Sequence, residues 1–254
     1  MVFLKMDTEY GLFSAIVLGF LLGLKHATDA DHVVAVASIV DRSKNIWRGL
    51  WIGISWGIGH TTPLLILGII ILLFKETVLD RYESIAPFFE FAVGIMLILL
   101  GAQVFWQIRR NRVHVHEHHH DEKTHVHVHT SHQFNEDISE TDDHNFFKIG
   151  MPSFRTKSFF VGMIHGLAGS AAVMLALLPT IESTWIGIIY LILFGVGTIL
   201  SMSIITILLG VPFAMSSNNK KLYNYISISA GTISILFGVA LMSDIGLGTS
   251  LIPF

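Results

Sequence analysis

The sequence predicts an all-α polytopic membrane protein. Of its 254 residues, 52% are hydrophobic and only 14% are charged, whereas a soluble domain is about 25% charged. The mean hydropathy of +0.63 agrees with this. Six apolar segments are long enough to cross a bilayer, which takes about 20 residues each; they cover residues 10–40, 46–74, 85–108, 158–178, 185–211 and 223–245.

The first apolar segment is too long for one straight span. We expect it to tilt, or to break near residues 27–30 into a span and a half helix, which would add a seventh crossing. A break at membrane depth is tolerated where the backbone lines a cavity.

The six segments form two similar sets of three. Gly23-Leu-Lys-His26 recurs as Gly162-Met-Ile-His165, and Trp51-Ile-Gly-Ile recurs as Trp185-Ile-Gly-Ile. Because each set has three spans, the second is inverted relative to the first, as in many secondary transporters. We therefore expect a first three-helix repeat at residues 1–108, a loop at 109–157 and a second three-helix repeat at 158–254.

The stretch from Lys25 to His32 places charged and titratable side chains inside the first apolar segment. Such residues at membrane depth cost several kcal/mol and are functional by default. Two imidazoles and two carboxylates without a thiol suit a divalent transition-metal ion. The candidate ligands are His26, Asp29, Asp31 and His32.

Helix geometry leaves the roles of the two carboxylates open. At about 100° per residue, His26, Asp29 and His32 share one face of a regular helix, while Asp31 points nearly opposite to His26. Either the helix deforms, or Asp31 supports a ligating histidine from behind or pairs with Lys25. A polar network that only ties helices together is the simpler alternative.

Two further histidines lie at membrane depth in other segments. His60 follows Gly57-Ile-Gly59 and precedes Thr61, Thr62 and Pro63, and we expect it to be the next ligand, with a threonine as polar support. His165 occupies the position of His26 in the second repeat. The ligand role and a structural role remain equally open for His165.

The central loop at residues 109–157 carries ten of the fourteen histidines. Its low apolar content predicts disorder, and His-rich tracts are typical of metal binding. We expect a weak, multi-site cation buffer, unless the repeat has no role at all. Its histidines are His114, His116, His118, His119, His120, His125, His127, His129, His132 and His144.

The distribution of Lys and Arg predicts the orientation in the cytoplasmic membrane. One side of the six-span arrangement holds most of them, including the loop residues Arg109, Arg110 and Arg112, while the other holds only Lys5, Lys75 and Arg81. The His-rich loop is therefore expected in the cytoplasm and both termini outside. The net charge of −3 suggests no nucleic-acid partner.

The motif His26-Ala-Thr-Asp-Ala-Asp31-His32 resembles the H-x4-D-H signature of the nickel/cobalt transporter family, and Gly59-His60-Thr61-Thr62 resembles its second signature. The resemblance implies that His26, Asp31, His32 and His60 serve the uptake of Ni(II), sometimes Co(II). The family usually has eight spans and an Asp-Thr motif in its second half. Here His165-Gly-Leu-Ala-Gly-Ser takes that place, as in smaller urease-accessory membrane relatives.

We therefore expect a secondary transporter that imports Ni(II) or Co(II) as substrate and uses no catalytic cofactor. The lipid bilayer and a cytoplasmic nickel chaperone or urease accessory protein are the expected partners. Efflux of Ni or Co and a Zn or Mn carrier are the alternatives within transport, and a metal-docking role of the loop is a third. The alternative of another class is a membrane acyltransferase or metal-dependent hydrolase that uses His26 and Asp31, although we expect no enzyme.

Overall fold

The computed structural model describes residues 8–40, 46–110, 114–120, 123–129, 154–168, 172–216 and 219–252. Within these ranges the chain forms helices and one β-hairpin. The first half contains α1 (Thr8–His26), α2 (Ala30–Val40), α3 (Ile46–Phe74) and α4 (Glu76–Arg110), followed by the strands β1 (His114–His120) and β2 (Lys123–His129). The second half contains α5 (Thr156–Gly166), α6 (Ala172–Leu177), the short 3-10 helix η2 (Leu178–Thr180), α7 (Thr184–Met215) and α8 (Lys220–Leu247).

The membrane-spanning elements confirm the all-α polytopic class. Four of the described helices, α3, α4, α7 and α8, are long and apolar enough to cross a bilayer. The pair α1 and α2 qualifies as a fifth span if it is counted as one, and its two parts are bent by 55°. The first apolar segment therefore breaks at residues 27–29, which is the second of the two forms that the sequence predicts.

The predicted span at residues 158–178 is not a single helix. It is divided between α5, with 11 residues, and α6, with six, while residues 169–171 lie outside the described part of the chain. Neither helix approaches the roughly 20 residues that a straight span needs. The described residues therefore give four or five spans where the sequence predicts six.

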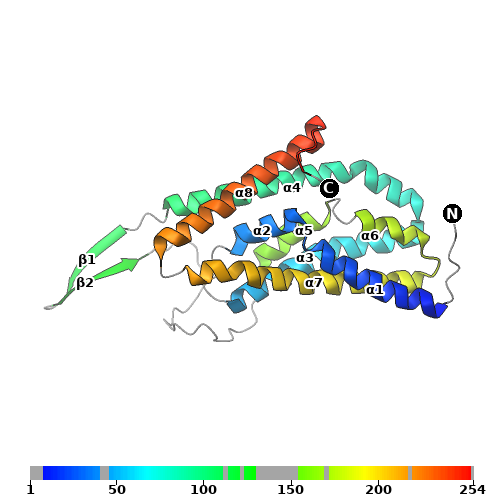
Figure 1. The fold of residues 1–254 in the computed structure, drawn as a ribbon, viewed down its shortest axis with the longest axis horizontal. Coiled ribbons are helices and arrows are strands. Elements are labelled where there is room, and N and C mark those ends of the chain that lie inside the picture. The colour runs from blue at the N-terminus through cyan, green and yellow to red at the C-terminus, as the bar shows by residue number, and fades with distance from the viewer. Residues whose placement is uncertain are drawn as a thin grey trace.

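Figure 1 shows how the helices are layered. The long helices α4 and α8 run side by side along one edge, and α1 and α7 lie together on the opposite side. The short helices α2 and α5 lie between these layers: α2 packs against α4, α7 and α8, and α5 packs against α3 and α4. This arrangement encloses the inner ends of both broken segments in the protein interior.

Glycines bring α4 and α8 into close contact. A Cβ added at Gly94 would lie 3.0 Å from the carbonyl oxygen of Gly238, and one added at Gly101 would lie 2.5 Å from that of Gly231. The reverse contacts are equally close, because a Cβ at Gly238 would lie 2.6 Å from the oxygen of Gly94. Such reciprocal contacts are the signature of a two-fold relation between two packed elements.

The same relation holds for α3 and α7. Gly57 of α3 packs on Ile199 of α7, and Gly195 of α7 packs on Thr61 of α3. One shift in residue number relates both pairs and matches the segment Gly57-Ile-Gly59-His60 to Gly195-Val-Gly197-Thr198. The sequence comparison, which matched Trp51 to Trp185, was wrong by one helical turn. The structure therefore makes Thr198 the counterpart of His60.

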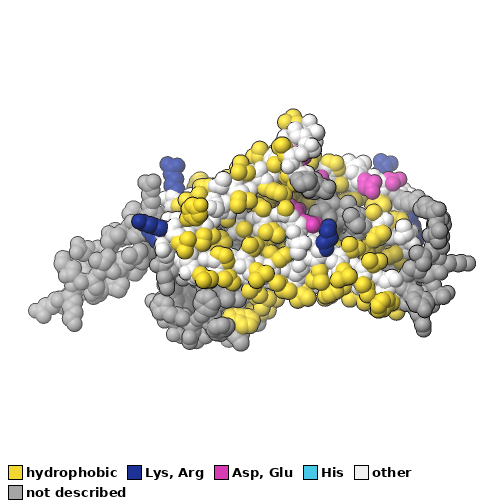
Figure 2. All heavy atoms as spheres, viewed as in Figure 1, with side chains coloured by type: hydrophobic (Ala, Val, Ile, Leu, Met, Phe, Trp, Pro, Cys, Tyr) yellow, Lys and Arg dark blue, Asp and Glu magenta, His cyan; other side chains and the backbone are white. Residues whose placement is uncertain are grey.

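The outer surface is apolar, as a lipid-facing surface must be. Large exposed side chains occur on all the long helices, among them Phe13, Leu73, Leu99, Leu208 and Leu236. Figure 2 shows this apolar face, which a small group of charged side chains interrupts near its middle. Lys25 and Asp29, at the break between α1 and α2, form a charged pair that reaches the surface of the protein, with 75% and 29% of their side chains exposed.

The hairpin lies in the loop for which the sequence predicts disorder. β1 and β2 pair antiparallel, with His114 opposite His129 and His120 opposite Lys123. The alternation of valine with histidine in this stretch has the period of two that strands require. Figure 1 shows the hairpin at one end of the molecule, away from the helix layers. His132 and His144 lie outside the described residues.

Candidate metal centre

The break between α1 and α2 is built by short polar residues. The backbone N–H and the hydroxyl of Thr28 both donate to the carbonyl oxygen of Lys25, at 2.8 and 2.6 Å. Threonine and aspartate side chains compete with the backbone for such bonds and so favour helix ends. As a result α1 ends at His26, and His32 lies in the first turn of a helix with a different direction.

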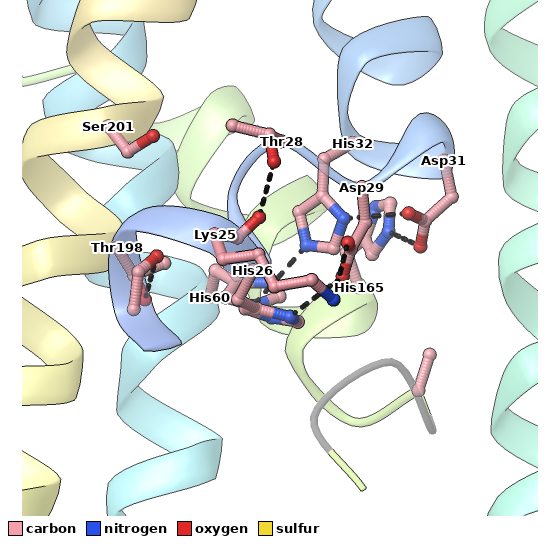
Figure 3. A network of polar contacts seen from close by, with 12 residues as sticks. Lys25, His26, Thr28, Asp29, Asp31, His32, His60, His165, Thr198 and Ser201 are labelled. Carbon is pink, nitrogen blue, oxygen red and sulfur yellow. Dashed lines mark hydrogen bonds and ion pairs between the residues drawn. The ribbon is translucent and has the colours of Figure 1, made fainter. Parts of the chain in front are cut away.

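Three imidazoles from three helices converge at this break. His26 of α1 and His60 of α3 approach with their Nε2 atoms 2.8 Å apart, and the Nε2 atoms of His32 and His60 are 3.5 Å apart. All three side chains are buried, with at most 4% of their surface exposed. Figure 3 shows them pointing toward one another. Their ligand atoms lie within 4.8 Å of one another, which is close enough to hold one metal ion.

The two carboxylates contact the outer nitrogens of two of these imidazoles. Asp29 Oδ2 lies 3.2 Å from His26 Nδ1, and Asp31 Oδ1 lies 2.8 Å from His32 Nδ1. A carboxylate that accepts the Nδ1–H of a histidine fixes the ring and leaves the lone pair of Nε2 for a metal. Both carboxylates thus stand behind imidazoles: Asp29 reaches His26 across the helix break, and Asp31 contacts His32, its neighbour in the first turn of α2.

His165 of α5 joins this cluster through Asp31. Its Nε2 atom lies 2.8 Å from Asp31 Oδ2, and its ring centroid is 4.3 Å from that of His32. His165 is fully buried, and its Nδ1 atom has no hydrogen-bond partner among the described residues. Tyr82 of α4 lies at the end of α5, where its hydroxyl approaches the carbonyl oxygens of Leu167 and Ala168 at 3.4 Å.

Other buried polar atoms around His60 also lack partners among the described side chains. They are Nδ1 of His60, Oγ1 of Thr61 and Nε1 of Trp56. Buried polar groups are nearly always hydrogen-bonded, so this part of the interior is suited to a polar guest. The predicted support residue Thr61 is buried next to His60, but its hydroxyl forms no hydrogen bond with an imidazole among the described residues. Its methyl group packs against Gly195.

Two hydroxyl groups on α7 hold the end of α1, and sequence reasoning missed both. Ser201 Oγ donates to the carbonyl oxygen of Leu24 at 3.0 Å. Thr198 Oγ1 lies 3.3 Å from the carbonyl oxygen of Gly23 and 2.9 Å from that of Phe194. The carbonyls in the last turn of a helix lack intrahelical partners, and these hydroxyls supply one. The signal was the repeat of Gly-x-Gly at residues 57–59 and 195–197.

The structure therefore brings together six residues, five from four helices and Asp29 from the break between α1 and α2: His26, Asp29, Asp31, His32, His60 and His165. The loop histidines at positions 114–129 lie on the hairpin strands β1 and β2, at the end of the molecule in Figure 1. The cluster combines imidazole nitrogens with carboxylates in a buried, thiol-free setting. That donor set suits ions such as Ni(II), Co(II) and Zn(II).

Comparison with known proteins agrees with this chemistry. Residues 12–246 match the NicO family, described as high-affinity nickel-transport protein. The chain is 38% identical over 238 residues to the urease accessory protein UreH of a Bacillus species, covering 94% of each chain. It is 24% identical over 271 residues to a high-affinity nickel transport protein of Cupriavidus necator, covering 93% of this chain and 71% of that one.

A further relative is the chloroplast protein FOR GROWTH AND FERTILITY 2 of Arabidopsis thaliana. The identity is 26% over 238 residues, covering 92% of this chain and 57% of the plant protein. No solved structure matches the chain. The family match covers most of the sequence and all six residues of the buried cluster, and it describes a transporter rather than an enzyme. The chain is therefore a multi-pass membrane protein that belongs to the NicO family of nickel-transport proteins.

Proposed function

We propose that the chain imports Ni(II), with Co(II) as a second substrate, across the cytoplasmic membrane through the buried histidine cluster. The observation that carries this proposal is the convergence of three Nε2 atoms, from His26, His32 and His60, with carboxylates behind two of the rings. We term His26, His32 and His60 the first subsite. An ion held there exchanges part of its water shell for three imidazole nitrogens.

The donor chemistry supports nickel as the substrate. Neutral imidazole suits Ni(II), Co(II) and Zn(II), and the lack of cysteine in the chain excludes thiolate ligands. Asp29 and Asp31 supply negative charge next to the ion without occupying its three nitrogen positions. They also fix the rings, and such outer partners typically change metal affinity 10- to 100-fold, as an order of magnitude.

The membrane potential is sufficient to drive inward movement. One charge that crosses 100 mV gains about 2.3 kcal/mol, so a divalent ion gains about 5 kcal/mol. The ion would reach the cluster beside Asp29, whose side chain is partly exposed at the break between α1 and α2. Movement of the two halves against each other around the cluster would then open the opposite face.

The proposed orientation puts the His-rich loop in the cytoplasm and, with α5 and α6 counted together as one further broken crossing, both termini outside. The excess of Lys and Arg near the loop supports this orientation. In this orientation the loop would receive imported ions and buffer them. A nickel chaperone or a urease accessory protein would be the acceptor, in line with the name of the Bacillus relative.

Uptake of radioactive nickel into cells tests the proposal. Cells that express the intact chain should accumulate nickel above cells without it, with Co(II) competing more strongly than Zn(II) or Mn(II). The variant His26→Ala should abolish the accumulation. Ser38→Ala is the matched control, because Ser38 is buried in α2 and its hydroxyl faces the carbonyl of Val34 in its own helix.

Two results would contradict the proposal. Accumulation below that of control cells, together with greater tolerance of external nickel, would show efflux. Strong competition by Zn(II) or Mn(II) and weak competition by Co(II) would show a carrier for those ions instead.

A further inference from the structure

A second group of metal ligands lies beside the first subsite and shares one residue with it. Asp31, His32 and His165 offer ligand atoms that all lie within 4.8 Å of one another. Asp31 connects them, with Oδ1 at 2.8 Å from His32 Nδ1 and Oδ2 at 2.8 Å from His165 Nε2. Figure 3 shows Asp31, His32 and His165 together on the side of the cluster away from His60.

His32, the residue that the two groups share, faces each group with a different ring nitrogen. His32 Nε2 approaches His60, and His32 Nδ1 approaches Asp31. All three members of the second group are buried, with exposed fractions of 8%, 0% and 0% for Asp31, His32 and His165. One carboxylate and two imidazoles form a donor set that suits the same divalent ions as the first subsite.

The two groups also differ in which half of the chain builds them. The first subsite comes entirely from α1, α2 and α3, whereas the second includes His165 from α5. Asp31 lies between two imidazoles that belong to different halves of the chain. Burying its carboxylate at membrane depth costs free energy, and such a residue indicates a function beyond helix packing. An ion that moves from the first group to the second passes from contacts within one half to contacts between the halves.

We propose that Asp31, His32 and His165 form a second ion subsite, which the transported ion occupies in alternation with the first. This inference rests on the proposed transport function and adds a position along the path. The two subsites hold one ion at a time, for two reasons. First, a neutral imidazole offers one lone pair, so His32 can bind only one ion. Second, two divalent cations separated by little more than the imidazole ring of His32 would repel each other strongly.

Binding of Ni(II) to the purified full-length chain tests this proposal. The background for all variants carries serine in place of the ten loop histidines, so that only the buried cluster binds ions. Calorimetric titration of this background with Ni(II) should give one ion per chain. The double variant His26→Ala with His60→Ala removes two donors of the first subsite and should still bind one ion, with an affinity weaker by about 10- to 100-fold, the range typical of impaired metal sites.

Addition of His165→Ala to the double variant should abolish the remaining binding. The matched control is Ser158→Ala in the same double variant, because Ser158 is also buried in α5 but lies outside the cluster. It should leave the remaining binding unchanged. Thermal unfolding followed by tryptophan fluorescence verifies that each variant is folded.

The possible outcomes separate the second subsite from the transport function. A folded double variant that binds no Ni(II), or remaining binding that survives His165→Ala, would overturn the second subsite while the first stands. Two ions per chain in the background would overturn alternate occupancy. A folded background that binds no Ni(II) and imports none would overturn both the second subsite and the proposed function.

Discussion

The crossing of α1 over α7 and the crossing of α5 over α3 use the same backbone contacts. A Cβ at Gly23 of α1 would lie 2.1 Å from the carbonyl oxygen of Phe194, and one at Gly162 of α5 would lie 2.3 Å from that of Trp56. The partner helices contribute glycines of their own. A Cβ added at Gly59 of α3 would contact the carbonyl oxygen of Phe159 in α5, and one added at Gly197 of α7 would contact that of Phe20 in α1. Both crossings therefore depend on glycine, because any larger residue would push the helices apart.

The two crossings differ in their polar chemistry. The break that follows α1 carries Asp29, and Asp31 and His32 follow it in the first turn of α2, whereas the described residues that follow α5, Leu167 and Ala168, carry neither charge nor imidazole. His60 of α3 carries an imidazole where its counterpart on α7, Thr198, carries a hydroxyl near the end of α1. The repeat therefore supplies the scaffold twice, while the first half supplies the carboxylates and most of the proposed ligands.

The largest expected effect comes from the pair His60 and Thr198. His60→Ala removes one of three nitrogen donors and should reduce nickel uptake by more than about 100-fold, beyond the effect of losing an outer partner. Thr198→Ala removes only a hydroxyl that caps a helix end, and its cost of about 1 kcal/mol corresponds to a loss of about fivefold. Uptake at equal expression measures both. Equal losses would mean that the two halves share the ligand role.

Substitution of the glycines tests whether the two helix crossings contribute equally to the stability of the fold. Gly59→Ala and Gly197→Ala should each destabilise the fold by about 1–3 kcal/mol or more, because overpacking forces the backbone to move. Gly49→Ala is the control, since its Cβ would lie 3.4 Å from the nearest atom. Thermal unfolding in detergent measures the effect. Destabilisation in only one half would contradict the equivalence of the crossings.

Substitution of a carboxylate behind an imidazole should weaken Ni(II) binding less than substitution of an imidazole. Asp29→Asn keeps a side chain that accepts a hydrogen bond from His26 but removes its charge, and should weaken Ni(II) binding by about 10- to 100-fold. Asp80→Asn, on the exposed surface of α4, is the control and should leave binding unchanged. Binding is measured in the chain without loop histidines. Complete loss of binding in Asp29→Asn would instead make Asp29 a direct ligand.

The smallest expected effect concerns the hydroxyl that supports the helix break. Ser201→Ala removes the bond to the carbonyl oxygen of Leu24 and should reduce uptake by about fivefold, the equivalent of about 1 kcal/mol. Ser203→Ala is a close control on the same helix, because Ser203 bonds the carbonyl of Ile199 within α7. Similar uptake in both variants would show that the contact with α1 has no role in positioning His26.

The sequence was sufficient to predict the membrane class and to single out His26, His32 and His60, which the structure brings together, because titratable residues in an apolar segment are conspicuous. It also offered a place behind a histidine as one role for Asp31. The contact of Asp29 with His26 could not be predicted, because it depends on the exact break of the helix. Ser201 was missed because serines in apolar helices usually bond a carbonyl of their own helix.

The division of residues 158–178 into α5 and α6 was also beyond sequence reasoning. Apolar composition indicates membrane depth but does not distinguish one straight span from two short helices. The repeat was recognised, but its register in α3 and α7 was not, since the Trp-Ile-Gly-Ile match was more conspicuous than the Gly-x-Gly contacts that the packing uses. Whether His165 is a ligand remains a prediction for the binding experiment.

The most direct test of the first subsite is to measure the number of imidazoles bound to one nickel ion. X-ray absorption spectroscopy on the full-length chain without loop histidines, loaded with one Ni(II) per chain, reports this number. We predict three imidazole rings around the ion when the tighter, first subsite is filled, and two in His60→Ala if the ion remains bound. A shell of oxygen atoms with one imidazole or none would contradict the assignment of His26, His32 and His60 as the ion site.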